Sequence, residues 1–219
     1  MTVLTRMRIW LPDDPGVLGA VAAQIGAAEG NVIGLEVLER GDGVAVDELM
    51  VELPDREDAI DAVCRGVRTV AGAGVEEVKV LSSTALDRED SVLEAAAAIL
   101  QAASSTAALN ALLGQLMLLF ELSWLALADL SLDCFVETHG DVPPIQWVAA
   151  FAHGSRSGSD PANDTTGSGV FTEEVTETGL TVCGGRDLAI RYRERHEIAM
   201  LVKVTERFID ALRRPAHTH

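Results

Sequence analysis

Basic residues are scarce in this 219-residue chain, which has 17 lysines and arginines against 34 aspartates and glutamates. The formal net charge is −17. Nucleic acids and anionic lipids bind to basic surfaces, and neither half of the sequence offers one. The arginines between Arg186 and Arg214 alternate with acidic residues, which is typical of the solvated face of a helix. We therefore expect neither a nucleic-acid partner nor a membrane partner.

Cysteine is also scarce, with only Cys64, Cys134 and Cys183, which are far apart and form no CxxC pair. This usage predicts buried thiols in a reducing compartment. No basic segment followed by an apolar core precedes the first predicted strand, so no secretion signal is expected. Together these absences favour a cytoplasmic protein.

A membrane span is the one alternative that the hydropathy raises, because residues 95–120 contain no charged residue. That length is enough to cross a bilayer. However, polar residues interrupt the segment, and no lysine or arginine flanks it as an anchor. Two buried helices separated at Ser104-Ser105-Thr106 account for it better.

Sequence motifs of catalysis are absent: the chain has no GxSxG, HExxH or phosphate-binding loop. His139 and His153 lack the spacing of a pair of metal ligands. Asp164 begins a sequence that is superficially like that of phosphate-transferring aspartate enzymes, but it lies in a polar segment rather than at the tip of an apolar strand. We expect no catalytic residue, no cofactor and no metal site.

Regular patterns fill the first 81 residues. Strands are expected at 3–11, 31–38, 44–53 and 75–81, where apolar residues alternate or cluster, with a hairpin at Gly41–Gly43. Helices are expected at 17–28 and from Pro54-Asp55 to residue 71, where apolar residues recur at helical spacing. The element order is then βαββαβ, a ferredoxin-like α+β fold.

The segment Asp13-Asp14-Pro15-Gly16-Val17-Leu18 joins the first strand to the first helix. Pro15 suits the start of a helix, and Gly16 has no Cβ to keep a ligand away from the backbone. A free amino acid could place its carboxylate on the N–H groups that open the helix and its ammonium near Asp13 or Asp14. The alternative is a purely structural turn, since Asp, Pro and Gly are common in turns.

These residues, with Asn31-Val32-Ile33 at the start of the second strand, resemble those of an ACT domain over residues 1–81. The resemblance implies a small regulatory module that binds an amino acid between the first loop and the second strand of a neighbouring copy. It therefore implies a homo-oligomer. The ligand-binding residues that we expect are Asp13, Asp14, Gly16, Val17, Leu18, Asn31 and Ile33.

The second half begins after a polar linker, Ser82 to Leu86. Helices are expected at 87–103 and 106–122, strands at 124–130, 135–138, 145–152, 170–175 and 179–183, and a terminal helix at 193–212. The order of elements, with Gly184-Gly185-Arg186 and Arg193-Glu194, resembles a GAF domain over residues 87–213. That resemblance implies a sensory or dimerisation domain with a central antiparallel sheet.

Two functions remain open from the sequence. The first is a non-enzymatic regulatory protein that binds a small molecule, an amino acid, at the turn in the first domain. The alternative is an enzyme with a scattered active site under a loop at 153–169, controlled by the first domain.

Overall fold

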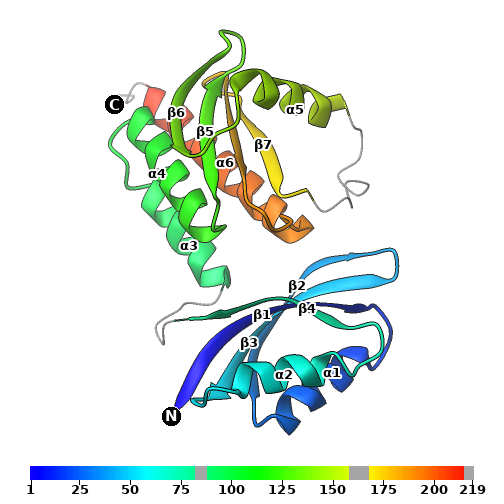
Figure 1. The fold of residues 1–219 in the computed structure, drawn as a ribbon. Coiled ribbons are helices and arrows are strands. Elements are labelled where there is room, and N and C mark those ends of the chain that lie inside the picture. The colour runs from blue at the N-terminus through cyan, green and yellow to red at the C-terminus, as the bar shows by residue number, and fades with distance from the viewer. Residues whose placement is uncertain (82–87, 158–167, 215–219) are drawn as a thin grey trace. The chain divides into compact units, whose positions relative to one another are not determined.

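The structure, a computed structural model, describes residues 1–81, 88–157 and 168–214. The chain divides into two compact units, Met1–Asp87 and Arg88–His219. The described residues form six helices and two antiparallel four-stranded sheets, so the expected α+β class is confirmed (Figure 1). The expected linker, Ser82 to Leu86, lies outside the described residues.

The first unit has the predicted order βαββαβ. Its elements are β1 (Thr2–Pro12), α1 (Val17–Ala27), β2 (Asn31–Gly41), β3 (Val44–Pro54), α2 (Ala59–Val67) and β4 (Gly74–Val80). The strands lie in the order β2-β3-β1-β4, and every neighbouring pair is antiparallel. This topology is ferredoxin-like and leaves β2 and β4 at the edges of the sheet.

The core of this unit lies between one face of the sheet and the two helices (Figure 1). Met7, Ile9 and Leu11 of β1 are buried there, as the alternation in the sequence predicts. From the other elements the core takes Leu49, Val51, Leu53, Val21, Ile25, Val63 and Val67. The sheet face that carries these side chains is called the helix-covered face below.

The sequence predicted the hairpin turn between β2 and β3 correctly but not the start of α2. Asp42 and Gly43 have φ of 52° and 76°, which is the two-residue turn that joins twisted antiparallel strands, so the expected hairpin is confirmed. The expected start of α2 at Pro54-Asp55 is wrong. Pro54 still belongs to β3, and the Asp55 N–H donates to the Met1 carbonyl at 3.1 Å, so the helix begins only at Ala59.

The second unit begins with two helices, continues with two strand pairs separated by a helix, and ends with a long helix. Its elements are α3 (Arg88–Ile99), α4 (Ser105–Leu119), β5 (Trp124–Asp129), β6 (Cys134–Gly140), α5 (Ile145–Ser157), β7 (Val170–Val175), β8 (Leu180–Gly185) and α6 (Tyr192–Arg213). The sheet order is β6-β5-β8-β7, antiparallel throughout.

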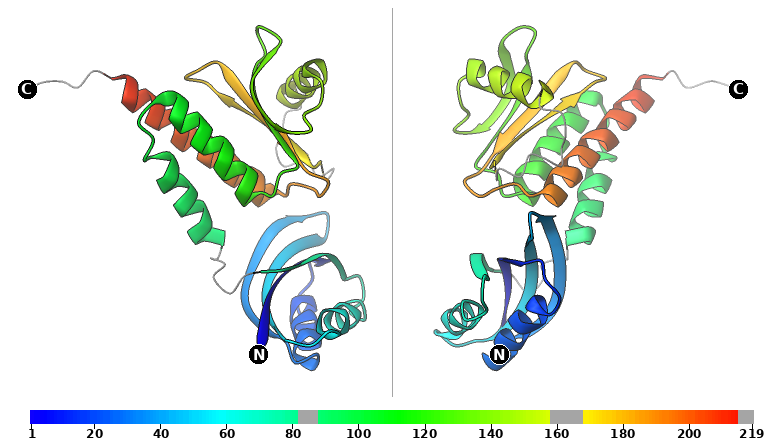
Figure 2. Two further views of the ribbon diagram at one scale, coloured as in Figure 1. Left: turned by 60° about the vertical axis from the view of Figure 1, so that its left-hand side comes forward. Right: turned by 90° about the vertical axis from the view of Figure 1, so that its right-hand side faces the viewer.

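Both faces of this second sheet are covered by helices (Figure 2). On one face, Leu125 and Leu127 pack into a core with residues of α3, α4 and α6. Ala126 and Ala128 alternate with them on the other face, where α5 lies, and are equally buried.

The expected strand at 145–152 is wrong, because these residues form the first part of α5. The N–H groups of Trp147 and Val148 both donate to the Pro144 carbonyl, which begins the helix. The buried residues Val148 and Ala152 are four apart, which is helical spacing. The expected loop at 153–169 is also wrong in part, since 153–157 are helical, and 158–167 lie outside the described residues.

The uncharged segment 95–120 forms parts of α3 and α4 with the predicted break between them. Ser104 is the N-cap of α4, and its Oγ accepts a hydrogen bond from the Ala107 N–H at 3.2 Å. Among the residues that the structure describes, no helix has the length and apolar character of a membrane span.

Candidate functional site

The turn before α1 places an open backbone at the start of a helix. Gly16 is the N-cap of α1 with φ of 92°, and no side chain among the described residues caps the helix. A Cβ built on Gly16 would meet no described atom within 4 Å. The Val17 N–H donates to the Asp14 carbonyl at 3.3 Å. The N–H groups that follow it in the first turn of α1, beginning with that of Leu18, have no helical acceptor, and such groups can bind an anion.

Asp13, an expected ammonium partner, is already paired. Its Oδ1 accepts from Nη2 of Arg40 at 2.7 Å and its Oδ2 accepts from Nε at 3.0 Å. This carboxylate raises the pKa of Arg40 above its ordinary value, first through the hydrogen bond and then through its charge. The Asp13 N–H also donates to the Gly43 carbonyl at 2.9 Å, which fixes the turn beside the β2–β3 hairpin.

A third charged residue near this turn, Asp47 of β3, was missed by sequence reasoning. Asp47 is 3% exposed, and its Oδ1 is buried with no hydrogen-bond partner among the described residues. Burial raises the pKa of Asp47, the negative charge of Asp13 raises it further, and Arg40 opposes both. Extending the β3 alternation of Leu49 and Val51 back by one step would have placed Asp47 on the helix-covered face.

The edge strand β2 exposes an apolar row near the same part of the sheet. Leu35 pairs with Leu49, and Val37 pairs with Asp47, so both lie on the helix-covered face. Yet Leu35 is 46% exposed and Val37 is 38% exposed. Ile33, an expected ligand contact, is 52% exposed and lies at a bulge between Val32 and Gly34. The helices therefore leave this edge of the sheet uncovered.

The structure brings Asp13, Asp14, Gly16, Val17 and Leu18 together in one turn but places Asn31 elsewhere. Asn31 begins β2 opposite Glu52, and its Nδ2 donates to Glu52 Oε2 at 3.4 Å. Arg40, which holds Asp13, lies at the other end of β2. At about 3.3 Å per residue, the ends of this strand are roughly 30 Å apart. A single copy of the first unit cannot form the whole expected site.

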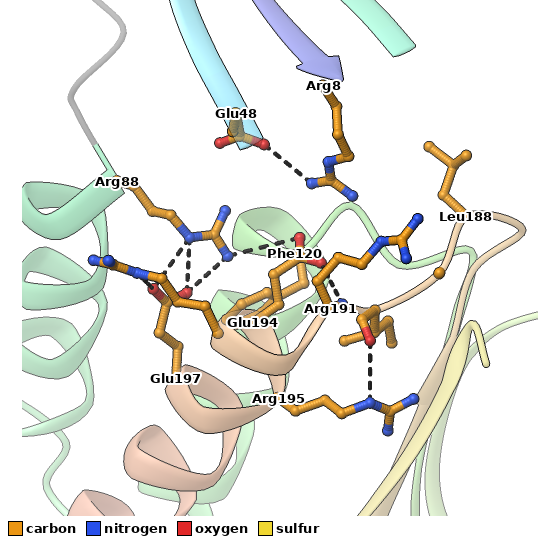
Figure 3. A network of polar contacts seen from close by, with 12 residues as sticks. Arg8, Glu48, Arg88, Phe120, Leu188, Arg191, Glu194, Arg195 and Glu197 are labelled. Carbon is orange, nitrogen blue, oxygen red and sulfur yellow. Dashed lines mark hydrogen bonds and ion pairs between the residues drawn. The ribbon is translucent and has the colours of Figure 1, made fainter. Parts of the chain in front are cut away.

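In the second unit, the two motifs behind the GAF resemblance are joined by a buried ion pair. Nη2 of Arg186 lies 2.7 Å from Oε2 of Glu194, and the same oxygen accepts from the Arg191 N–H at 2.8 Å. Arg88 lies beside Glu194 and Glu197 (Figure 3). These contacts hold the start of α6 in place, so we interpret them as structural.

Other reactive groups of the second unit are dispersed. Burial raises the pKa of the Cys183 thiol to about 12, which keeps it protonated, whereas Cys134 is exposed, so the expectation of buried thiols is wrong there. His139 lies 3.0 Å from Glu137 and His153 lies on α5. Within residues 1–81, 88–157 and 168–214, no group of three or more His, Cys, Asp and Glu side chains is placed to hold a metal ion.

No family model and no curated protein matches this chain. Among solved structures, the ACT domain from GTP pyrophosphokinase of Chlorobium tepidum is 22% identical, with a TM-score of 0.29, and the match covers 37% of this chain and all of that one. A putative glycine cleavage system transcriptional repressor is 9% identical, with coverage of 84% and 79% and a TM-score of 0.33. An unknown protein from Galdieria sulphuraria is 13% identical, with coverage of 94% and 93% and a TM-score of 0.32. Because all three TM-scores are below 0.5, our description of the fold depends on the strand order and register of this chain.

Proposed function

We propose that this protein is a non-enzymatic, cytoplasmic regulator that binds a free amino acid at the turn before α1. The observation that carries the proposal is the combination of an uncapped helix start with open space at Gly16. An amino-acid carboxylate would complement the N-terminal end of the helix dipole, and its oxygens would accept hydrogen bonds from the N–H groups that follow Val17. The regulatory role follows from the resemblance of this turn to that of ACT domains.

We further propose that two copies complete the site. The edge strand β2 has backbone groups available for pairing and an exposed apolar row. If β2 pairs antiparallel with its copy about its middle, near Glu36, Asn31 of the second copy comes beside Arg40 and the Asp13 turn. This arrangement would reunite Asn31 and Ile33 with the residues from which they are separated in one chain.

The second unit is proposed as a GAF-like domain that supports dimerisation or sensing. The central antiparallel sheet, covered by α3, α4 and α6 on one face and by α5 on the other, supports this assignment. The ion pair between Arg186 and Glu194 supports it further, because it links the glycine-arginine turn to the last helix.

A thermal-shift screen against the twenty amino acids tests the binding proposal. A ligand present at about one hundred times its Kd should stabilise the folded state by about 2.7 kcal/mol. Gly16→Asn should abolish the response, because asparagine tolerates a left-handed backbone but fills the open space. Gly179→Asn is the matched control, since Gly179 also has a positive φ and a Cβ there meets no described atom within 4 Å.

The binding proposal fails if no amino acid shifts the melting of the wild-type protein. It also fails if the Gly16→Asn variant responds as well as the Gly179→Asn control.

Light scattering tests the dimer. Leu35→Glu adds a charge to the exposed row on β2 and should convert dimers to monomers at micromolar concentration. Val80→Glu adds the same charge to β4, at the opposite edge, where Val80 is 55% exposed, and should leave the dimer intact. A monomeric wild-type protein, or a dimer that persists in Leu35→Glu, would contradict this pairing.

A further inference from the structure

Asp47 occupies a position where the fold calls for an apolar residue. Along β3, the residues on the helix-covered face are Ala45, Asp47, Leu49, Val51 and Leu53. Every member of this row except Asp47 belongs to the core of the first unit. On β1, the residue opposite Asp47 is the fully buried Ile9. A carboxylate at this position must therefore be explained by something other than packing.

The folded protein does not satisfy this carboxylate. Asp47 Oδ1 is buried and accepts no hydrogen bond from the residues that the structure describes. Arg40 lowers the pKa of Asp47 by its charge, but its hydrogen bonds go to the two oxygens of Asp13. A buried polar atom without a partner is rare in folded proteins, because it loses its water without gaining a replacement. Such an atom is suited to receive a donor from a ligand.

The exposed surface beside Asp47 lies over β2, on the part of the helix-covered face that α1 and α2 leave uncovered. On the β2 side, Asp47 pairs with Val37, which belongs to the outermost strand and is 38% exposed. The pairing of β2 with β3 is irregular between Val37 and Glu39, and such bulges commonly lie beside binding sites. Among the described residues, the partly exposed side chains of Leu35 and Val37 are therefore all that lies on this face between Asp47 and the end of the sheet in one copy, and a ligand on this face would lie beside Asp47.

We infer that Asp47 is the residue that recognises the ammonium group of the bound amino acid. The inference rests on the proposed function and gives it a specificity-determining residue. The ligand's carboxylate would lie on the N–H groups at the start of α1, and its ammonium would donate to Asp47. Asp13, whose charge Arg40 balances, would then shape the turn without binding the ammonium.

This assignment makes the ammonium group the basis of selectivity. An ammonium group supplies both the missing donor and the missing positive charge, so a charge-assisted hydrogen bond replaces an unsatisfied atom. A 2-hydroxy acid with the same side chain keeps the carboxylate but offers Asp47 no charge. The site should therefore favour amino acids over the corresponding 2-hydroxy acids.

Isothermal titration calorimetry on the full chain tests the inference. The probes are the twenty protein amino acids and, for each that binds, the 2-hydroxy acid with the same side chain. Asp47→Asn should weaken amino-acid binding at least tenfold and bring the affinities for the two members of a pair within about threefold of one another. Asp42→Asn is the control, because Asp42 is an exposed aspartate of the β2–β3 hairpin turn.

Asp47→Val is a second variant, in which the row on β3 becomes apolar throughout. It should keep the fold by circular dichroism, melt at a higher temperature than the wild-type protein and bind no amino acid. Amino-acid affinity within threefold of wild type in both Asp47 variants would overturn the inference and leave the proposed function intact. A wild-type protein that binds no amino acid would overturn both.

Discussion

The two units each bury a carboxylate, and they treat it in opposite ways. Glu194 of the second unit is 1% exposed and contacts Arg186, Arg88 and the Arg191 N–H. Asp47 of the first unit is nearly as buried, yet its Oδ1 has no partner among the described residues. Fully partnered buried charges fix a structure, whereas an unsatisfied one costs stability. Glu194 is therefore a structural carboxylate, whereas Asp47 is the carboxylate that we propose binds a ligand.

The largest effect should come from removing the partnered carboxylate. Glu194→Gln leaves Arg186 buried without a counter-charge, and breaking such a pair typically costs about 3–5 kcal/mol. We expect the free energy of unfolding of the second unit, measured by urea titration, to fall by an amount in this range. Glu89→Gln is the control, because Glu89 pairs with Arg193 at 3.4 Å but is largely exposed. If Glu194→Gln and Glu89→Gln lowered the free energy of unfolding equally, the buried ion pair would contribute no more to stability than the exposed one.

Removing the unsatisfied carboxylate should have the opposite sign. Asp47→Val replaces a buried polar group by an apolar one in an apolar row. The substitution removes the cost of burying an unsatisfied polar group, which is of the order of 1–3 kcal/mol. The free energy of unfolding of the first unit should therefore rise. A decrease would mean that Asp47 has stabilising contacts, and the contrast with Glu194 would disappear.

A smaller effect on the free energy of unfolding is expected at Glu173 of β7. This carboxylate is only partly buried, whereas Glu194 and Asp47 are almost fully buried. Burial raises its pKa to about 6, and Glu206 also raises it, whereas Arg195 lowers it. Because the folded state holds this proton more tightly than the unfolded state, the contribution of Glu173 to stability is greatest below pH 4.5 and is lost as the pH rises through 6.

Glu173→Gln should remove that pH dependence. Above pH 7 the variant should be more stable than wild type by up to about 2 kcal/mol, and near pH 4.5 the two should be equal. Urea titrations between pH 4.5 and 7.5 measure the difference. Glu177→Gln is the control, because it removes the same charge from an exposed position between β7 and β8. If the difference in free energy of unfolding between Glu173→Gln and the wild-type protein stayed constant across this pH range, the pKa of Glu173 would not be raised in the folded state.

Much of the fold could be predicted because apolar spacing determines which faces are buried. Met7, Ile9 and Leu11 alternate in the sequence and are buried in the structure, and Ile198, Leu201 and Val202 of α6 follow helical spacing and are buried as well. The prediction was wrong at α5 because the run from Ile145 to Ala152 is nearly continuous in apolar residues, and periodicity cannot separate a buried strand from a helix there. Pro144, directly before the run, was the local signal for a helix.

The candidate site was only partly predictable for a different reason. The turn from Asp13 to Leu18 is contiguous in sequence, so its residues are found together. The face on which Asp47 lies follows from the alternation along β3, but the pairing of Asp13 with Arg40 joins residues 27 positions apart and depends on strand register, as does the pairing of Asp47 with Ile9. Local patterns carry little information on such pairings. The separation of Asn31 from the turn likewise follows from the parallel directions of β1 and β2 on either side of β3.

Amino-acid binding at the turn before α1 can be measured by an amide chemical-shift titration of the ¹⁵N-labelled protein with free amino acids. We predict that at least one amino acid shifts the backbone amides of Gly16, Val17 and Leu18 in a saturable manner, and that its 2-hydroxy analogue does so far more weakly. Amides that remain unchanged with every amino acid at millimolar concentration, or saturable shifts that occur only in the second unit, would contradict binding at this turn.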